Sequence, residues 1–193
     1  VADLEAALDA ARAELAAFLG AQPADLAFVP NATHGVNAVL RSFPLDPGDE
    51  LLVTDHAYNA CRATLEHAAA RAGALVTVAA IPFPLAGPGD ILGAVLARVT
   101  PRTRLALLDH VSSPTALIHP ITDLVRELQR RHVAVLVDGA HGPGTLPLSL
   151  DELGADWYTG NCHKWLCAPK GAGFLWARRD RHRGLHPVCI SPG

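Results

Sequence analysis

The sequence has no methionine, only two lysines, and aromatic residues at just 5% of its 193 positions. It also lacks an excess of basic residues, because its formal net charge is −3, and this argues against binding to nucleic acid or to an anionic membrane surface. No apolar run approaches the roughly 18 residues of a membrane span, and the first residues carry acids where a signal peptide has its basic start. We therefore expect a cytoplasmic protein.

Disulfide, metal and nucleotide motifs are also missing. The four cysteines do not show the paired spacing of a disulfide framework or a zinc ribbon, so reduced thiols are expected. Cys162, His163 and Cys167 could begin a metal site, but no fourth ligand follows at tetrahedral-site spacing, and we expect no metal. No G-x-G-x-x-G follows the first predicted strand, and no G-x-x-x-x-G-K-[ST] occurs, which argues against nucleotide binding.

What the sequence does contain is enough apolar material for one core. Hydrophobic residues make up 50% of the chain and charged residues 18%, which is typical of a soluble globular protein. We predict a single domain over residues 1–193. The missing methionine, even at the first position, and the end at Ser191-Pro192-Gly193 indicate a piece of a longer protein.

Short apolar runs alternate with segments of helical periodicity. Seven strands are predicted at Leu26–Val29, Leu51–Thr54, Leu75–Ala80, Arg104–Asp109, Val133–Val137, Asp156–Thr159 and Ala172–Trp176. Helices are predicted at Leu4–Leu19, Thr33–Phe43, Tyr58–Ala72, Ile91–Val99 and Ile121–Arg131. The fold class is therefore α/β, with a mainly parallel seven-stranded sheet covered by helices on both faces. Only a loop fits between the last two strands, so these pair as neighbours and make the sheet mixed.

Ligands of open α/β sheets bind at the carboxyl ends of the strands, so polar residues at those ends are site candidates. The first strand is followed by Asn31, Ala32 and Thr33 at the start of a helix, where free backbone N–H groups favour an anion such as phosphate. Asn31 or Thr33 could equally serve only as the helix cap. The second strand is followed by His56 and Tyr58, whose rings could stack on a flat cofactor or simply pack at the helix surface.

The fifth and sixth strands lead to the strongest candidates. Asp138 ends an apolar strand, where a carboxylate needs a cation or several donors, and His141 follows three residues later. Loop N–H groups could satisfy this aspartate without any ligand. Lys164 follows Asn161 and His163 on a loop entering aromatic surroundings, where burial lowers an amine's pKa and makes it nucleophilic. The alternative is a solvent-exposed lysine with no functional role, which is the usual environment of lysines.

Four segments together occur in an order and spacing that resemble the class V aminotransferase-like enzymes, which use pyridoxal-5′-phosphate (PLP): Asn31-Ala32-Thr33, Asp55-His56-Ala57-Tyr58, Asp138-Gly139-Ala140-His141 and Asn161-Cys162-His163-Lys164. The likeness extends from Leu26 to His186 and is greatest to the isopenicillin N epimerase-like branch, near the cysteine desulfurases. It implies the large domain of a fold type I PLP enzyme.

The resemblance also implies roles for individual residues. Lys164 would form the Schiff base with PLP and move the α-proton of a bound amino acid, and Asp138 would keep the pyridine nitrogen protonated. His141 would lie near the phenolic oxygen, and His56 or Tyr58 would stack on the ring. The remaining cofactor-binding residues, mostly around the phosphate, would be Asn31, Ala32, Thr33, Asn161 and His163.

The sequence departs from the family at three points. Ser113 stands where desulfurases have an asparagine over the cofactor, and is a weaker substitute for it. The persulfide-forming cysteine of desulfurases lies on a later loop, which the 193 residues do not reach, and Cys162 and Cys167 lie in the wrong segment for that role. The C-terminal small domain, which in the family supplies an arginine for the substrate carboxylate, is also missing from the 193 residues.

Two hypotheses follow for the function. The first is a PLP-dependent enzyme core that acts at the α-carbon of an amino acid by epimerase, lyase or aminotransferase chemistry. The second is a binding or scaffold module, or a truncated fragment, that keeps the fold without turnover. Family members are usually homodimers, so the resemblance also implies a homodimer. The expected partner is a small-molecule substrate, an amino acid.

Overall fold

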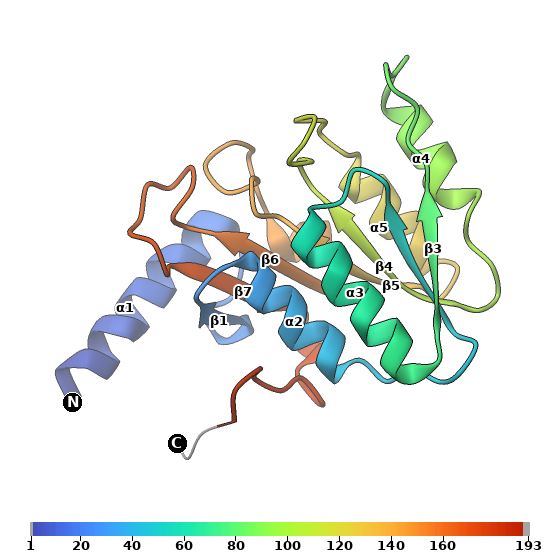
Figure 1. The fold of residues 1–193 in the computed structure, drawn as a ribbon. Helices are drawn as coiled ribbons and strands as arrows, with labels where there is room; N and C mark the ends of the chain where they lie inside the picture. The colour runs from blue at the N-terminus through green and yellow to red at the C-terminus, as the bar shows by residue number, and fades with distance from the viewer. Residues whose placement is uncertain (1, 191–193) are drawn as a thin grey trace.

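A seven-stranded β-sheet forms the centre of this computed structural model, which describes residues 2–190 (Figure 1). Val1 and residues 191–193, at the two ends of the predicted domain, lie outside the described residues. In chain order the strands are β1 (Leu26–Val29), β2 (Glu50–Thr54), β3 (Leu75–Ala79), β4 (Thr103–Asp109), β5 (Ala134–Asp138), β6 (Trp157–Asn161) and β7 (Gly173–Ala177). Their order in the sheet is β1-β7-β6-β5-β4-β2-β3, which confirms the predicted seven-stranded sheet.

The sheet is mixed, as predicted. Strands β6, β5, β4, β2 and β3 run parallel, whereas β7 is antiparallel to β6. The short loop between β6 and β7 allows no crossover helix, and this explains the reversal. The pairing of β1 with β7 was not predicted, and it places β1 at the sheet edge, antiparallel to β7. The carboxyl end of β1 therefore lies on the same side of the sheet as the carboxyl end of β6.

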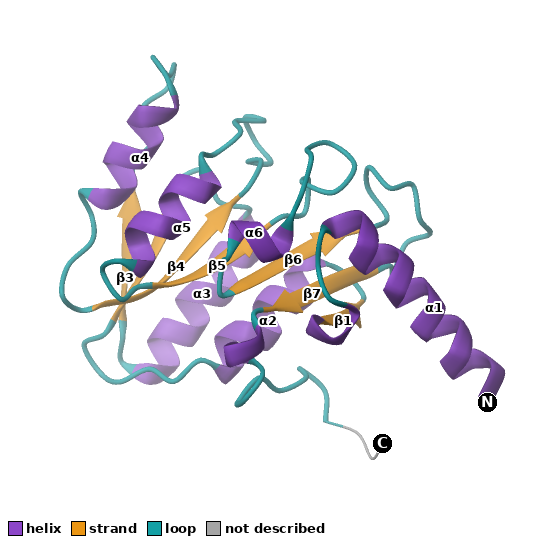
Figure 2. Ribbon diagram, turned by 180° about the vertical axis from the view of Figure 1, so that it is seen from behind, coloured by secondary structure: helices purple, strands orange, loops and turns teal. Residues whose placement is uncertain are grey.

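Helices cover both faces of the sheet. One face carries α2 (Ala32–Ser42) and α3 (Asn59–Ala72), which lie in front of the strands in Figure 1. The view from behind shows α1 (Ala2–Leu19), α5 (Ile121–Gln129) and α6 (Leu150–Leu153) on the other face, with α4 (Pro88–Leu96) beside β3 (Figure 2). None of the described helices is long and apolar enough to cross a bilayer.

Several element boundaries differ from those predicted. Strands β5 and β6 each begin one residue later and end further along than predicted, so that Asp138 and Asn161 are the last residues of their strands. Helix α3 begins at Asn59, and Tyr58 is its N-cap residue. Helix α6 and the two short 3₁₀ segments, Pro23–Asp25 and Arg179–Arg181, were not predicted. A single helical turn is too short to show the periodicity on which such a prediction depends.

Each face of the sheet has its own apolar core. Alternate strand residues such as Leu105, Leu107 and Leu136 pack under α2 and α3, whereas Ala106, Leu108 and Val135 pack under α1, α4 and α5. Asp109 and Asp138 continue the first set, because side chains two residues apart in a strand share a face. Both carboxyls therefore lie on the α2–α3 side.

A buried ion-pair network closes the opposite end of β5 and β6. Asp156 is fully buried, and one of its oxygens accepts hydrogen bonds from Arg178 Nη2 at 2.9 Å and Arg181 Nε at 2.7 Å. The other oxygen accepts the Val135 backbone N–H at 2.7 Å and Gln129 Nε2 at 3.3 Å. Four donors compensate for burial of this charge, so the network joins β5, β6 and the segment after β7.

We predict that Asp156→Ala lowers the free energy of unfolding by about 2 kcal/mol in urea titrations. This is less than the loss for a fully buried pair, because about a third of each arginine side chain is exposed. The control is Asp180→Ala, which removes a more exposed carboxylate from the same two arginines and should cost less than about 1 kcal/mol. If both variants lose the same free energy of unfolding, the buried Asp156 does not contribute more to stability than the exposed Asp180.

Candidate functional site

Polar residues from four strand ends meet at one edge of the sheet. Asp109 at the end of β4 is the register partner of Asp138 at the end of β5, and Asp138 is in turn the partner of Thr159 in β6. Gly173 at the start of β7 pairs with both Asn161 and Val29, and thereby brings the ends of β6 and β1 together. The topology therefore collects the predicted site segments, as expected for open α/β sheets.

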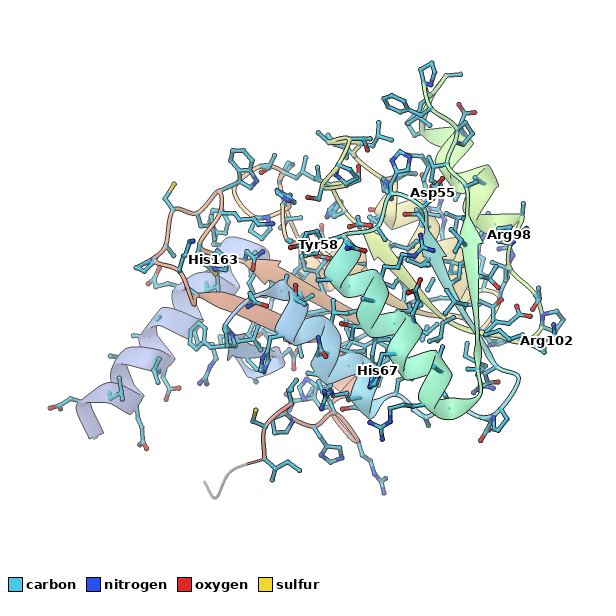
Figure 3. The ribbon with its side chains drawn as sticks, in the orientation of Figure 1. Asp55, Tyr58, His67, Arg98, Arg102 and His163 are labelled. Atoms are coloured by element: carbon cyan, nitrogen blue, oxygen red, sulfur yellow. The ribbon has the colours of Figure 1, made fainter. Side chains whose placement is uncertain are left out.

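Figure 3 shows the same convergence from the side chains it labels. Tyr58 at the start of α3 and His163 in the loop after β6 lie toward the carboxyl-end edge, whereas His67 lies further along α3. The exposed ring of Tyr58 is free of the apolar core. This edge is the candidate functional site.

Asp138 is the buried acid of the site. Its carboxylate is held by two donors: Cys61 donates its thiol to Oδ2 at 3.0 Å, and the backbone N–H of Ala140 donates to Oδ1 at 3.0 Å. Burial and the neighbouring aspartate raise the pKa of the Cys61 thiol, so it remains a protonated donor. A carboxylate has about four acceptor positions, so Asp138 retains capacity for a further donor.

The loop after Asp138 packs tightly over Tyr158. A Cβ atom at Gly139 or Gly142 would collide with the Tyr158 ring or its hydroxyl, so close approach requires glycine at both positions. The ring stacks on Phe174 with an interplanar angle of 4°, and its hydroxyl lies 3.0 Å from His110 Nδ1. This packing determines where Asp138 and His141 lie above the sheet.

Lys164 contacts His141, and the contact defines its protonation state. Lys164 Nζ lies 3.0 Å from His141 Nε2, while the indole N–H of Trp165 donates to His141 Nδ1 at 3.2 Å. An indole N–H can only donate, so Nδ1 accepts and the proton of the neutral imidazole is on Nε2. Nε2–H then donates to Lys164, which requires a lone pair on Nζ. The hydrogen-bond pattern is therefore consistent with Lys164 as a neutral amine.

The electrostatics of this pair favour the same state. Lys164 is half-buried, and burial lowers its pKa although Asp138 opposes the shift. Burial lowers the pKa of His141, and a positive charge on Lys164 would lower it further. The second lysine, Lys170, is exposed. Only Lys164 thus combines partial burial with a histidine partner.

The start of α2 faces the loop after β6. Asn31 caps the helix by accepting the backbone N–H of His34 at 2.8 Å, which confirms the capping alternative for this residue without excluding ligand contact. The backbone N–H of Ala32 donates to Asn161 Oδ1 at 2.8 Å. His163 Nδ1 lies 2.8 Å from the carbonyl of Ala172, which orients its ring. Asn31, Ala32 and Asn161 are thus together at one helix N-terminus, and His163 lies on the loop that continues from Asn161.

The remaining predicted site residues are His56, Tyr58, Ser113 and Thr33. His56 Nδ1 is 2.9 Å from Thr115 Oγ1, so its ring is anchored to the loop after β4. Ser113 is exposed in that loop, and its neighbour Ser112 makes the loop's hydrogen bonds to Thr115 and Leu117 instead. The roles assigned to His56, Tyr58 and Ser113 stay predictions. Thr33 Oγ1 is 3.9 Å from Cys61 Sγ, within reach of the buried thiol.

Sequence reasoning missed two residues of the site, Asp109 and Cys61. Asp109 is 4% exposed, and burial together with the charge of Asp138 raises its pKa to about 8. Its Oδ1 accepts the backbone N–H of Tyr58 at 3.4 Å. The position of Asp109 as the last residue of a predicted strand is the sequence signal that could have indicated it. A buried cysteine in a helix carries no comparable signal.

Metal ligation is not indicated within residues 2–190, where no cluster of three or more His, Cys, Asp or Glu side chains is arranged around a possible ion. The described cysteines, Cys61, Cys162, Cys167 and Cys189, are free thiols.

Comparison with known proteins identifies relatives with named activities. The chain is 42% identical over 186 residues to isopenicillin N epimerase of Amycolatopsis lactamdurans, a match that covers 95% of this chain and 47% of that protein. It is 35% identical over 185 residues to a probable chloroplastic L-cysteine desulfhydrase of Arabidopsis thaliana, covering 85% and 38%. The chain thus spans about half the length, or less, of these relatives.

Solved structures show the same fold. The cystine C–S lyase C-DES in complex with its reaction product cysteine persulfide superposes with a TM-score of 0.87 at 30% identity, covering 93% of this chain and 48% of that one. A lysine-to-alanine variant of C-DES with glycine covalently linked to its PLP cofactor also has a TM-score of 0.87. The sequence model of the class V aminotransferases matches residues 1–193. The chain therefore belongs to the class V aminotransferase family of PLP-dependent enzymes.

Proposed function

We propose that this chain is the cofactor-binding part of a PLP-dependent enzyme that acts at the α-carbon of an amino acid, with Lys164 as the Schiff-base lysine. Family membership supports the cofactor, and the relatives include an epimerase and C–S bond-cleaving enzymes. All of these names fit labilisation of a bond at or next to the α-carbon. The reaction class therefore covers epimerisation, elimination and amino transfer.

The observation that carries this proposal is the contact of Lys164 with His141. Attack on an aldehyde requires a neutral amine, and the Trp165–His141–Lys164 hydrogen bonds favour a lone pair on Nζ. With an amino acid bound at the cofactor, the Lys164 amine would be the group that removes and returns the α-proton. His141 serves to orient Nζ for both tasks.

The donor set of the site fits PLP. When bound, PLP supplies an electron sink that stabilises negative charge at the substrate α-carbon. The buried carboxylate of Asp138, with remaining acceptor capacity, would hold a proton on the pyridine nitrogen. Cys61 and Ala140 keep that carboxylate oriented.

The start of α2 would hold the phosphate. Backbone N–H groups at a helix N-terminus favour an anion, and Thr33 contributes a hydroxyl there. Asn161 links this helix to the end of β6 through Ala32, and His163 lies on the adjoining loop. His56 or Tyr58, both in the segment between β2 and α3, would stack on the ring.

Replacing Lys164 tests the proposal directly. We expect Lys164→Ala to abolish the covalent PLP absorption band and the borohydride-trapped label, which in the unaltered chain should map to the Lys164 peptide. Lys170→Ala, which removes an exposed lysine six residues away, is the matched control and should leave both unchanged. A label distributed over Lys170 and the amino terminus in the unaltered chain would contradict the assignment.

Removing His141 should slow the attachment of PLP. In His141→Ala the amine loses its hydrogen-bond donor, so a larger fraction of Lys164 is protonated at neutral pH. A rise of one pKa unit would lower the attachment rate about tenfold at pH 7, and the rates should converge at high pH. The rate is measured by absorption as a function of pH, with His67→Ala on the far part of α3 as control. An unchanged pH profile would count against the tautomer argument.

Turnover is tested by exchange of the α-proton. The PLP-loaded chain, incubated with a panel of L-amino acids in D₂O, should exchange the Cα proton of at least one of them, as followed by NMR. Exchange should be lost in Lys164→Ala. Stable PLP binding without exchange for any amino acid would favour the scaffold hypothesis instead.

A further inference from the structure

The site contains a second buried carboxyl, Asp109, that the proposed chemistry does not use. Asp109 and Asp138 are register partners at the ends of adjacent parallel strands, and their side chains lie on the same face of the sheet. Both residues are nearly fully buried, at 4% and 3% exposed. Two acids of like charge in such a position cannot both be ionised without a large electrostatic cost.

The groups that face Asp109 do not offset a second negative charge. From α3 and the residue before it come the backbone N–H of Tyr58 and the thiol of Cys61, whose pKa is raised in part by Asp109 itself. In the β2–α3 segment, His56 lies 2.9 Å from Thr115 Oγ1 and 3.9 Å from the Asp55 carboxylate, and neither His56 nor Asp55 is hydrogen-bonded to Asp109. The cationic candidate, Lys164, interacts with Asp138 and His141, and the His141 contact favours a neutral amine. The surroundings are therefore short of positive charge.

The two acids differ in their hydrogen-bond partners. Asp138 accepts two hydrogen bonds, from a thiol and from a backbone N–H, each with a donor–acceptor distance of 3.0 Å. The hydrogen bond from a backbone N–H to Asp109 is longer, at 3.4 Å. Donors stabilise an ionised carboxylate, so the negative charge belongs on Asp138 and the proton on Asp109. Burial and Asp138 together raise the pKa of Asp109 to about 8, in agreement with this assignment.

We propose that Asp109 is a positioning residue that stays protonated beside Asp138, so that the pair presents a single negative charge to the pyridine nitrogen of PLP. The inference deepens the proposed function and rests on it for the identity of the ligand. The protonation of Asp109 itself concerns the chain without cofactor. It can therefore be measured separately.

The experiment is an unfolding titration of the apo chain between pH 5 and 9. In the unfolded chain Asp109 titrates near its ordinary pKa of about 3.9, whereas in the folded chain it holds its proton to about pH 8. Through this group the folded state binds one more proton across this window, so its contribution to stability falls as pH rises. Burial lowers the pKa of His110 and His119 to about 4, and these two groups add the opposite dependence below about pH 6.5 in every variant, so the Asp109 contribution is read as the difference between the unaltered chain and Asp109→Asn. The unfolding equilibrium constant should gain about tenfold per pH unit from this group until pH 8, and no more above it.

Asp109→Asn keeps the size and the neutral charge of the protonated acid, and should remove this one-proton slope. Asp151→Asn, an exposed acid on α6, is the matched control and should keep the slope. Infrared spectra at pH 7 provide a second readout, because the carbonyl stretch of a protonated carboxyl should be present in the unaltered chain and absent from Asp109→Asn. The proposal would be overturned if Asp109→Asn kept both the pH dependence of unfolding and the infrared band of the protonated carboxyl.

PLP binding separates the two proposals. At pH 7 Asp109→Asn should bind PLP within about threefold of the unaltered chain, since the local charge is the same, whereas Asp138→Asn should bind at least about tenfold more weakly. A loss in Asp109→Asn as large as in Asp138→Asn would overturn the positioning role. If the unaltered chain shows the Asp109 pH dependence of unfolding but does not bind PLP, the proposed function and the ligand assignment are overturned. The protonation of Asp109 would still be supported in that case.

Discussion

The burial of the Asp138 carboxylate is the constraint on which the rest of this site depends. An ionised acid at the end of an apolar strand is costly unless donors surround it, and here a thiol from α3 and a backbone N–H from its own loop provide them. The loop can turn back over the strand end only because two glycines allow contact with Tyr158. Helix α3, the loop after β5 and the ring of Tyr158 are thus placed around one charge.

The same loop also presents the partner of the reactive lysine. His141 follows Asp138 by three residues and is held between Trp165 and Lys164 by a hydrogen bond on each ring nitrogen. Because the indole can only donate, the imidazole must donate on its other side, and this favours the neutral form of the Lys164 amine. Two residues adjacent in the chain, Lys164 and Trp165, therefore act on opposite nitrogens of one imidazole.

Much of the fold could be predicted because strand and helix periodicities are local properties. The predicted boundaries of β5 and β6 lie too close to the amino terminus. An apolar pattern does not indicate that Asp138 and Asn161 continue the hydrogen-bonded strands. Ser113 was placed by resemblance alone, yet the structure leaves it exposed while its neighbour Ser112 holds the loop. A one-residue distinction in a loop depends on tertiary hydrogen bonds that no local pattern records.

The sequence by itself determined the α/β class, the reversal at β7, and a list of polar residues at strand ends, because each depends on spacing along the chain. Only the tertiary structure decided which of them touch. The pairing of Asp109 with Asp138 follows from the register of β4 and β5, and the donation by Cys61 follows from the packing of α3 on the sheet. Protonation states depend on burial and on neighbours distant in sequence, so the charge of this site is a property of the folded chain.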